Sequence, residues 1–138
     1  MHTNRRDVAA TAERVRGALQ DLAGWSAWLP GCLSAIDDPQ PDGTRDVTLR
    51  LRAPRTLALR ISVEMTEEGI RYALIEGDVS AASGTVAIAA KGEGAEITWE
   101  QEIAFSTPVP RPLLRELEDE VVPRWLAALA AHAEALSS

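Results

Sequence analysis

Hydrophobic and polar residues alternate along the middle of the chain, from residue 44 to residue 105. Strict alternation places every second side chain on one face of an extended strand, and it is typical of antiparallel sheets with one buried face. Turns rich in Gly, Asp, Glu and Ser separate the alternating segments. We therefore predict five antiparallel strands, with a further short edge strand within residues 5–10. The five segments are 44–52, 57–64, 70–74, 86–88 and 97–105.

A helical spacing of apolar residues precedes these strands. Thr11 is expected to cap a helix in which apolar residues recur at intervals of three and four up to Leu22. Gly24 is expected to end this helix. Residues 25–29 are expected to form a second short helical turn, which a Pro-Gly pair ends.

The last segment of the chain is also predicted to be helical. Its apolar stripe consists of Leu113, Leu114, Leu117, Val121, Val122, Trp125, Leu126 and Leu129. Pro123 lies within this stripe, so we expect a kink or a division there, because proline removes a backbone hydrogen bond. A helix reaching about residue 135 would be roughly 33 Å long. The predicted fold is α+β: a curved antiparallel sheet wrapped around a long C-terminal helix, with two short N-terminal helices, in one domain over residues 1–138.

Composition and charge mainly indicate which kinds of partner this chain does not bind. The chain has 14 Lys and Arg against 21 Asp and Glu, a net charge of -7, which repels nucleic-acid phosphates. We therefore expect no nucleic-acid partner. One cysteine and two distant histidines form no zinc motif, so no metal or cofactor is expected. With no signal peptide and no apolar stretch of roughly 20 residues, we expect a cytoplasmic protein without integral membrane association.

Three stretches of the sequence carry a family resemblance. They read VRGALQDLAGWSAWLPGC from Val15, YALIEGDVSAASGTVAI from Tyr72 and EITWEQEIAFSTPVPRPLL from Glu96. Together with the order of the predicted elements, they resemble the START-like superfamily, also called SRPBCC or helix-grip. Within it, the likeness is to the polyketide cyclase/dehydrase and coenzyme-Q-binding branch. The resemblance implies a cavity between the sheet and the C-terminal helix, where members of the superfamily bind lipids, sterols, polyketides, quinones or plant hormones.

Ten residues are expected to line this cavity. They lie on the inward face of the predicted strands, on the stripe of the C-terminal helix, or beside the second helical turn. They are Trp99, Tyr72, Gln101, Trp25, Trp125, Leu49, Ile61, Phe105, Leu117 and Val121. Each of them can alternatively be explained by ordinary core packing, since large apolar and aromatic side chains dominate protein interiors.

Gln101 is the most informative of these residues, because a buried amide must be hydrogen-bonded. A bond to Tyr72 or to water would explain it without a ligand, whereas a ligand oxygen would give it an orienting role. Glu76 shares strand parity with Tyr72 and would be a candidate acid or base inside a cavity. We expect it instead to be solvated, because the strand ends directly after it at Gly77.

The chain offers no convincing nucleophilic triad. His132 is placed near the end of the C-terminal helix, and Cys32 has no obvious activating neighbour in the sequence. Three functions stay open at this point, and no catalytic residue is assigned. The first is binding or transport of a hydrophobic small molecule without catalysis. The second is a polyketide cyclase or dehydratase, a lyase of the aromatase/cyclase type. The third is a protein–protein module, with a homodimer through an open sheet edge.

Overall fold

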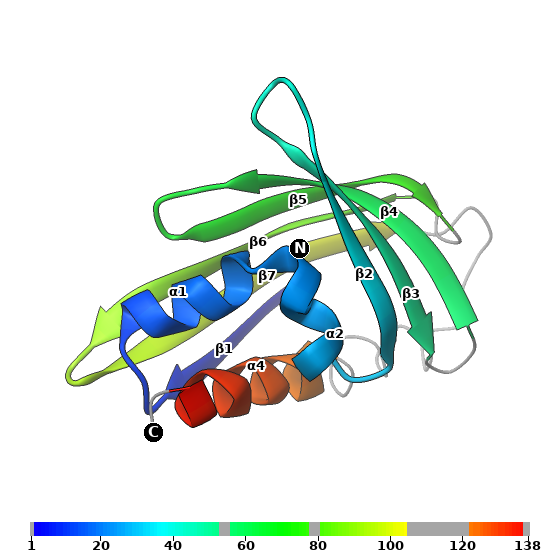
Figure 1. Cartoon of the computed structure of the whole chain (residues 1–138). Coiled ribbons are helices and arrows are strands. Elements are labelled where there is room, and N and C mark those ends of the chain that lie inside the picture. Colours follow the sequence, from blue (N-terminus) through cyan, green and yellow to red (C-terminus); the bar gives the residue numbers. More distant parts are fainter. Residues whose placement is uncertain (1, 53–55, 78–80, 105–121, 137–138) are drawn as a thin grey trace.

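The computed structural model describes residues 2–52, 56–77, 81–104 and 122–136 (Figure 1). A strand and three short helical elements come first, six further strands follow, and a helix ends the described chain. In order, the elements are β1 (His2–Val8), α1 (Ala12–Gln20), η1 (Leu22–Gly24), α2 (Trp25–Trp28), β2 (Cys32–Pro39), β3 (Arg45–Arg52), β4 (Thr56–Met65), β5 (Gly69–Gly77), β6 (Ala81–Lys91), β7 (Gly94–Ala104) and α4 (Val122–Leu136).

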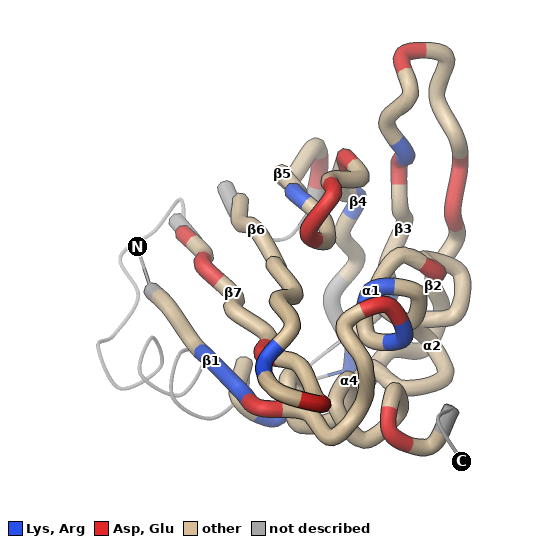
Figure 2. The backbone as a smooth tube through the Cα atoms, turned by 90° about the vertical axis from the view of Figure 1, so that its left-hand side faces the viewer, with Lys and Arg blue, Asp and Glu red and all other residues tan. Residues whose placement is uncertain are grey.

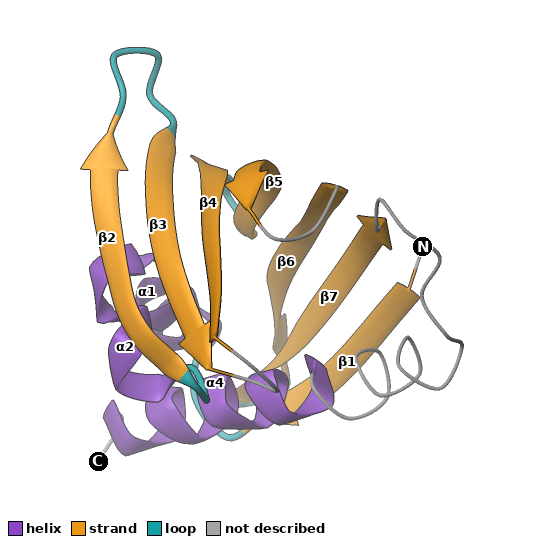
Figure 3. Cartoon of the chain, turned by 90° about the vertical axis from the view of Figure 1, so that its right-hand side faces the viewer, coloured by secondary structure: helices purple, strands orange, loops and turns teal. Residues whose placement is uncertain are grey.

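All of these strands belong to one seven-stranded antiparallel sheet. Its strand order is β1-β7-β6-β5-β4-β3-β2, so each strand from β2 to β7 pairs with its neighbour in sequence and β1 closes the series beside β7. The sheet curves around the helices, with α1 across β5, β6 and β7 and with α4 beside β1 (Figures 1 and 3). The predicted α+β architecture, a curved sheet gripping a C-terminal helix, is confirmed.

The edge strand β2 is a correction to the predicted strand set. Its residues do not alternate in burial, and a bulge interrupts the register between Cys32 and Ser34. Its large apolar residues point outward, with Leu33 50% exposed and Ile36 61% exposed. An edge strand pairs on one side only and needs no continuous apolar face, so the alternation that predicts a strand is missing here. A homodimer through this open edge stays a prediction.

The N-terminal helices agree with the sequence in kind and differ in their boundaries. The hydroxyl of Thr11 accepts a hydrogen bond from the backbone N–H of Arg14 at 3.3 Å, which is the expected N-cap. Helix α1 ends at Gln20, earlier than predicted. The backbone of Asp21 leaves the helical region, and residues 22–24 form the 3₁₀ turn η1 before α2. The first strand also begins earlier than predicted, at His2.

Pro123 is the second described residue of helix α4, so the predicted kink or division at this proline falls where the described residues begin. The predicted helical residues 113–121 lie outside the described residues. Leu126 and Leu129, each 1% exposed, belong to a core cluster that also includes Val15 of α1 and Ile97 of β7. This cluster joins the helices and the sheet into one core.

Charged residues of both signs are interspersed along the described backbone (Figure 2). Several of them pair across neighbouring strands. Lys91 Nζ lies 2.9 Å from Asp7 Oδ1 and 3.4 Å from Glu96 Oε2, which joins β6, β1 and β7 at one end of the sheet. Arg45 and Asp37 join β3 to the edge strand β2, with Nη2 and Oδ2 2.6 Å apart. No described helix is long and apolar enough to cross a membrane.

Candidate ligand-binding site

An aromatic cluster formed by Tyr72, Trp99 and Trp125 lies between the sheet and α4. The rings of Trp99 on β7 and Trp125 on α4 stack with centroids 5.7 Å apart, and Tyr72 on β5 meets Trp99 edge-on at 6.3 Å. The indole N–H of Trp99 donates a 2.9 Å hydrogen bond to the Tyr72 hydroxyl. All three rings are partly buried and pack against the main core. The alternation in the sequence predicted this shared inward face for Tyr72 and Trp99.

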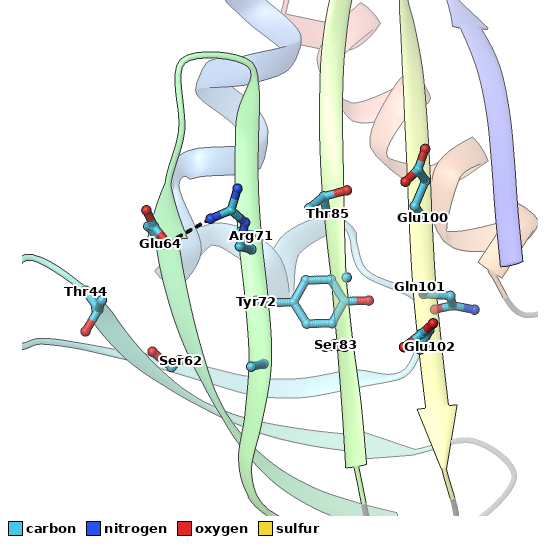
Figure 4. Close-up of a pocket in the computed structure, with 12 residues that line it drawn as sticks. Thr44, Ser62, Glu64, Arg71, Tyr72, Ser83, Thr85, Glu100, Gln101 and Glu102 are labelled. Carbon is cyan, nitrogen blue, oxygen red and sulfur yellow. Dashed lines mark hydrogen bonds and ion pairs between the residues drawn. The ribbon is translucent and has the colours of Figure 1, made fainter. Parts of the chain in front are cut away.

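The contact between Tyr72 and Trp99 depends on a glycine in the strand between them. Tyr72 is paired with Gly84 of β6, and Gly84 is paired in turn with Gln101 of β7. A Cβ atom at Gly84 would lie 2.8 Å from the Tyr72 hydroxyl oxygen and 2.5 Å from the carbonyl oxygen of Glu100. The Tyr72 side chain therefore crosses β6 over a position that has no side chain, and its hydroxyl reaches toward β7 (Figure 4).

Gln101 is buried beside this cluster, with 4% of its surface exposed. Its Nε2 atom has no hydrogen-bond partner within the described part of the chain. The bond to Tyr72 that would explain Gln101 without a ligand is not found there. Nδ2 of Asn4 is likewise buried without a hydrogen-bond partner among the described residues. Asn4 belongs to β1 and pairs directly with Trp99. Asn4 is not among the predicted lining residues, because the first strand was expected only from residue 5 onward.

The Tyr72 hydroxyl is the only titratable group among the three rings and the two amides. Burial raises the pKa of this phenol from 10.0 to about 12, against a smaller lowering by the hydrogen bond from Trp99. Loss of its proton would leave a charge in a poorly solvated place. At neutral pH Tyr72 is therefore a neutral donor and acceptor, and it is unsuited to act as a base.

The raised pKa of Tyr72 predicts a loss of stability in alkali. Folding favours the protonated phenol, so its contribution is complete below pH 10 and falls as pH rises toward 12. The free energy of unfolding should drop by about 2 kcal/mol between pH 10 and pH 12, and by about 2.7 kcal/mol in total once the pH has passed 12, from this group alone. The chain has a single tyrosine, so the ultraviolet absorbance of tyrosinate reports Tyr72 directly. The difference between wild type and Tyr72→Phe in urea unfolding at pH 9 and above isolates its share. An ordinary pKa near 10 in the folded protein would contradict the prediction.

The other predicted lining residues are not part of the aromatic cluster. Leu49 and Ile61 are buried on the inner face of β3 and β4, 5% and 6% exposed. Trp25 is 6% exposed, and its indole N–H donates to the carbonyl oxygen of Leu19 at 2.8 Å. Phe105, Leu117 and Val121 lie outside the described residues.

Trp25 belongs to a second aromatic group, at the other end of α4. Its ring meets Trp28 edge-on at 6.3 Å, and Trp28 stacks on His132 at 6.5 Å. His132 lies two helical turns beyond Trp125 on α4. The two aromatic groups therefore contact opposite ends of this helix.

The candidate reactive side chains are not assembled into a catalytic set in the described part of the chain. Glu76 is exposed, as expected, and pairs with Arg60, with Oε2 and Nη2 3.3 Å apart. Burial raises the pKa of the Cys32 thiol, whose Sγ contacts the carbonyl oxygen of Ser34. A protonated thiol is a weak nucleophile. No group of three His, Cys, Asp or Glu side chains among the described residues is placed to hold a metal ion.

A separate groove of about 360 Å³ lies along the sheet (Figure 4). Most of its lining residues have polar or charged side chains, although the surface they expose to the groove is mainly apolar. The lining consists of Thr44, Ser62, Glu64, Arg71, Ser83, Thr85, Glu100 and Glu102, together with Tyr72, Ala73, Gly84 and Gln101. Because side chains alternate along a strand, Arg71 and Glu100 face away from the side that carries the aromatic cluster. The groove has charged side chains along it, including Arg71 and Glu100, whereas the aromatic cluster contains no ionised side chain, so the cluster is the stronger candidate for an apolar ligand.

Comparison with known protein families assigns this chain to one of them. The chain matches the family described as polyketide cyclase / dehydrase and lipid transport over residues 2–136. The chain belongs to this family. A comparison with curated protein sequences gave no match.

Solved structures agree with this membership of the polyketide cyclase / dehydrase and lipid transport family. A START superfamily protein from Mycobacterium smegmatis is 20% identical, with a TM-score of 0.87 and 97% of each chain covered. The Zhui aromatase/cyclase from Streptomyces sp. R1128 is 19% identical, with a TM-score of 0.75 over 96% of this chain and 92% of that one. A STAR-related lipid transfer protein from Xanthomonas axonopodis is 17% identical, with a TM-score of 0.74 over 96% and 84%. At these identities the likeness establishes the START-type fold.

Proposed function

We propose that this protein binds or carries an apolar small molecule between the inner face of its sheet and α4, without catalysing a reaction on it. The observation that carries the proposal is the cluster of Tyr72, Trp99 and Trp125. These three large rings come from two strands and a helix, and none of them is fully buried. Aromatic faces on a partly open interior surface suit an apolar or planar ligand such as a lipid, a quinone or an aromatic polyketide.

The chemistry of the cluster favours binding over catalysis. Tyr72 keeps its proton at neutral pH, and the neighbouring amides of Asn4 and Gln101 do not titrate. A cyclase or dehydratase needs a group that takes or gives a proton near the operating pH. Glu76 does not supply one, because it is solvated and paired with Arg60. Structures with the same fold include both an aromatase/cyclase and a lipid transfer protein, so the fold is compatible with the binding role.

Tryptophan fluorescence provides the direct test. We expect saturable quenching or energy transfer at micromolar concentrations with at least one of four probes: an environment-sensitive naphthalene dye, a fatty acid, a quinone and an aromatic polyketide. Trp99→Leu should weaken that binding about tenfold or more, because it removes the ring that contacts both Tyr72 and Trp125.

Trp28→Leu is the matched control for Trp99→Leu. Trp28 stacks on His132, in the second aromatic group at the other end of α4, so this variant should keep the wild-type affinity. Circular dichroism of both variants checks that they fold. The proposal fails if no probe binds saturably, or if the two variants weaken binding equally.

A further inference from the structure

Two side-chain amides next to the aromatic cluster have N–H donors without acceptors in the part of the chain that the structure describes. Nε2 of Gln101 and Nδ2 of Asn4 are both buried, and neither has a hydrogen-bond partner within residues 2–52, 56–77, 81–104 and 122–136. An N–H group buried in this way costs about 1–3 kcal/mol relative to one that is hydrogen-bonded. Native proteins keep few such groups, so each of them calls for a functional or structural reason.

The strand register brings both amides to the same ring. Asn4 of β1 pairs directly with Trp99 of β7, and Gln101 is two residues along β7 on the same face. Diagonal neighbours on one face of a sheet are about 7–8 Å apart, so one small molecule can contact both amides. The Tyr72 hydroxyl lies across β6 on the same face and accepts from Trp99, which leaves its own hydrogen as a third donor.

These groups share a chemical bias. The free nitrogen atoms of both amides are donors only, and the neutral Tyr72 hydroxyl adds another donor. Around them are the aromatic faces of Trp99 and Trp125, which favour an apolar body. A ligand that matches both features is mainly apolar and carries an oxygen that accepts hydrogen bonds. A pure hydrocarbon of the same shape would leave the amide donors unpaired.

We propose that this site selects apolar ligands that carry a carbonyl oxygen, with the amides of Gln101 and Asn4 as the donors that bind it. The inference rests on the proposed binding function and specifies its ligand class: ketones, quinones and esters over isosteric hydrocarbons. Gln101 and Asn4 are then specificity-determining residues, and the ring cluster supplies the affinity that both kinds of ligand share.

A matched pair of probes separates the two contributions. Fluorenone and fluorene share one planar tricyclic skeleton and differ in a carbonyl against a methylene group. Their affinities are measured by displacement of a naphthalene dye from the whole protein. We expect the wild type to bind fluorenone about tenfold more tightly than fluorene, a difference that two hydrogen bonds can supply.

Near-isosteric apolar variants should remove this preference. Gln101→Met and Asn4→Leu should each bring the fluorenone-to-fluorene ratio to about threefold or less, while fluorene binds as tightly as before or more tightly. Gln40→Met makes the same chemical change away from the site, at a half-buried position where Nε2 donates to the carbonyl oxygen of Asp38, and it should keep the wild-type ratio. The two variants lie on different strands, so either one tests the assignment if the other folds poorly.

Each outcome has a definite meaning. Equal binding of the two probes by the wild type, or an unchanged ratio in both variants, overturns the carbonyl assignment while the binding function stands. No saturable dye binding at all overturns the binding function and the carbonyl assignment together.

Discussion

Gly84→Val is expected to lower the free energy of unfolding by about 3 kcal/mol or more. A Cβ at this position would lie 2.5 Å from the Glu100 carbonyl oxygen and 2.8 Å from the Tyr72 hydroxyl oxygen. The first contact is with the backbone of β7, which the sheet holds in place. The second is with the Tyr72 side chain, whose hydroxyl oxygen accepts a 2.9 Å hydrogen bond from Trp99 Nε1. Valine would therefore strain the β6–β7 pairing, displace Tyr72 and break its hydrogen bond.

Urea unfolding followed by tryptophan fluorescence measures this effect, and Gly17→Ala is its control. Gly17 is an exposed residue of α1, and no atom lies within 4 Å of a Cβ placed there. Alanine is the better helix former, so this change should raise stability by about 1 kcal/mol. A wild-type unfolding midpoint for Gly84→Val would mean that Tyr72 does not lie across β6.

The sequence was most informative where one face of an element is buried and the other is not. Alternation predicted the strands that became β3 to β7, because each of them separates the core from solvent. It also placed Tyr72, Trp99 and Gln101 on one face, since side-chain parity is a local property. β2 was missed for the same reason, because Leu33 and Ile36 of that edge strand are exposed.

Contacts between distant segments were beyond local patterns. The hydrogen bond from Trp99 to Tyr72 requires Gly84 in the strand between them, and that register depends on the lengths of two turns. Asn4 reaches the site because β1, near the start of the sequence, pairs with β7, more than 90 residues later. Trp25 was expected beside the cavity on grounds of family resemblance. Trp25 is buried and its indole N–H donates to the Leu19 carbonyl oxygen, and its place beside the cavity stays a prediction.

Leu129→Ala should lower the free energy of unfolding by about 2–5 kcal/mol. Leu129 is 1% exposed and belongs to the core cluster that joins α4 to α1 and the sheet. Removing its side chain loses the transfer free energy of the deleted methyl and methylene groups, and it leaves a cavity that rigid strands cannot close. The loss is a large share of the 5–15 kcal/mol that typically stabilises a domain.

Leu33→Ala is the matched control, because the same atoms are removed from a side chain that is 50% exposed on the edge strand. It should cost less than about 1 kcal/mol in the same urea experiment. Leu129 also lies one helical turn after Trp125, on the same side of α4. A loosened helix should therefore move the Trp125 ring away from Trp99 and weaken dye binding as well as stability, whereas Leu33→Ala should change neither. Equal costs for the two variants would mean that α4 does not close the inner face of the sheet, and the aromatic cluster would then lose the wall that makes it a binding site.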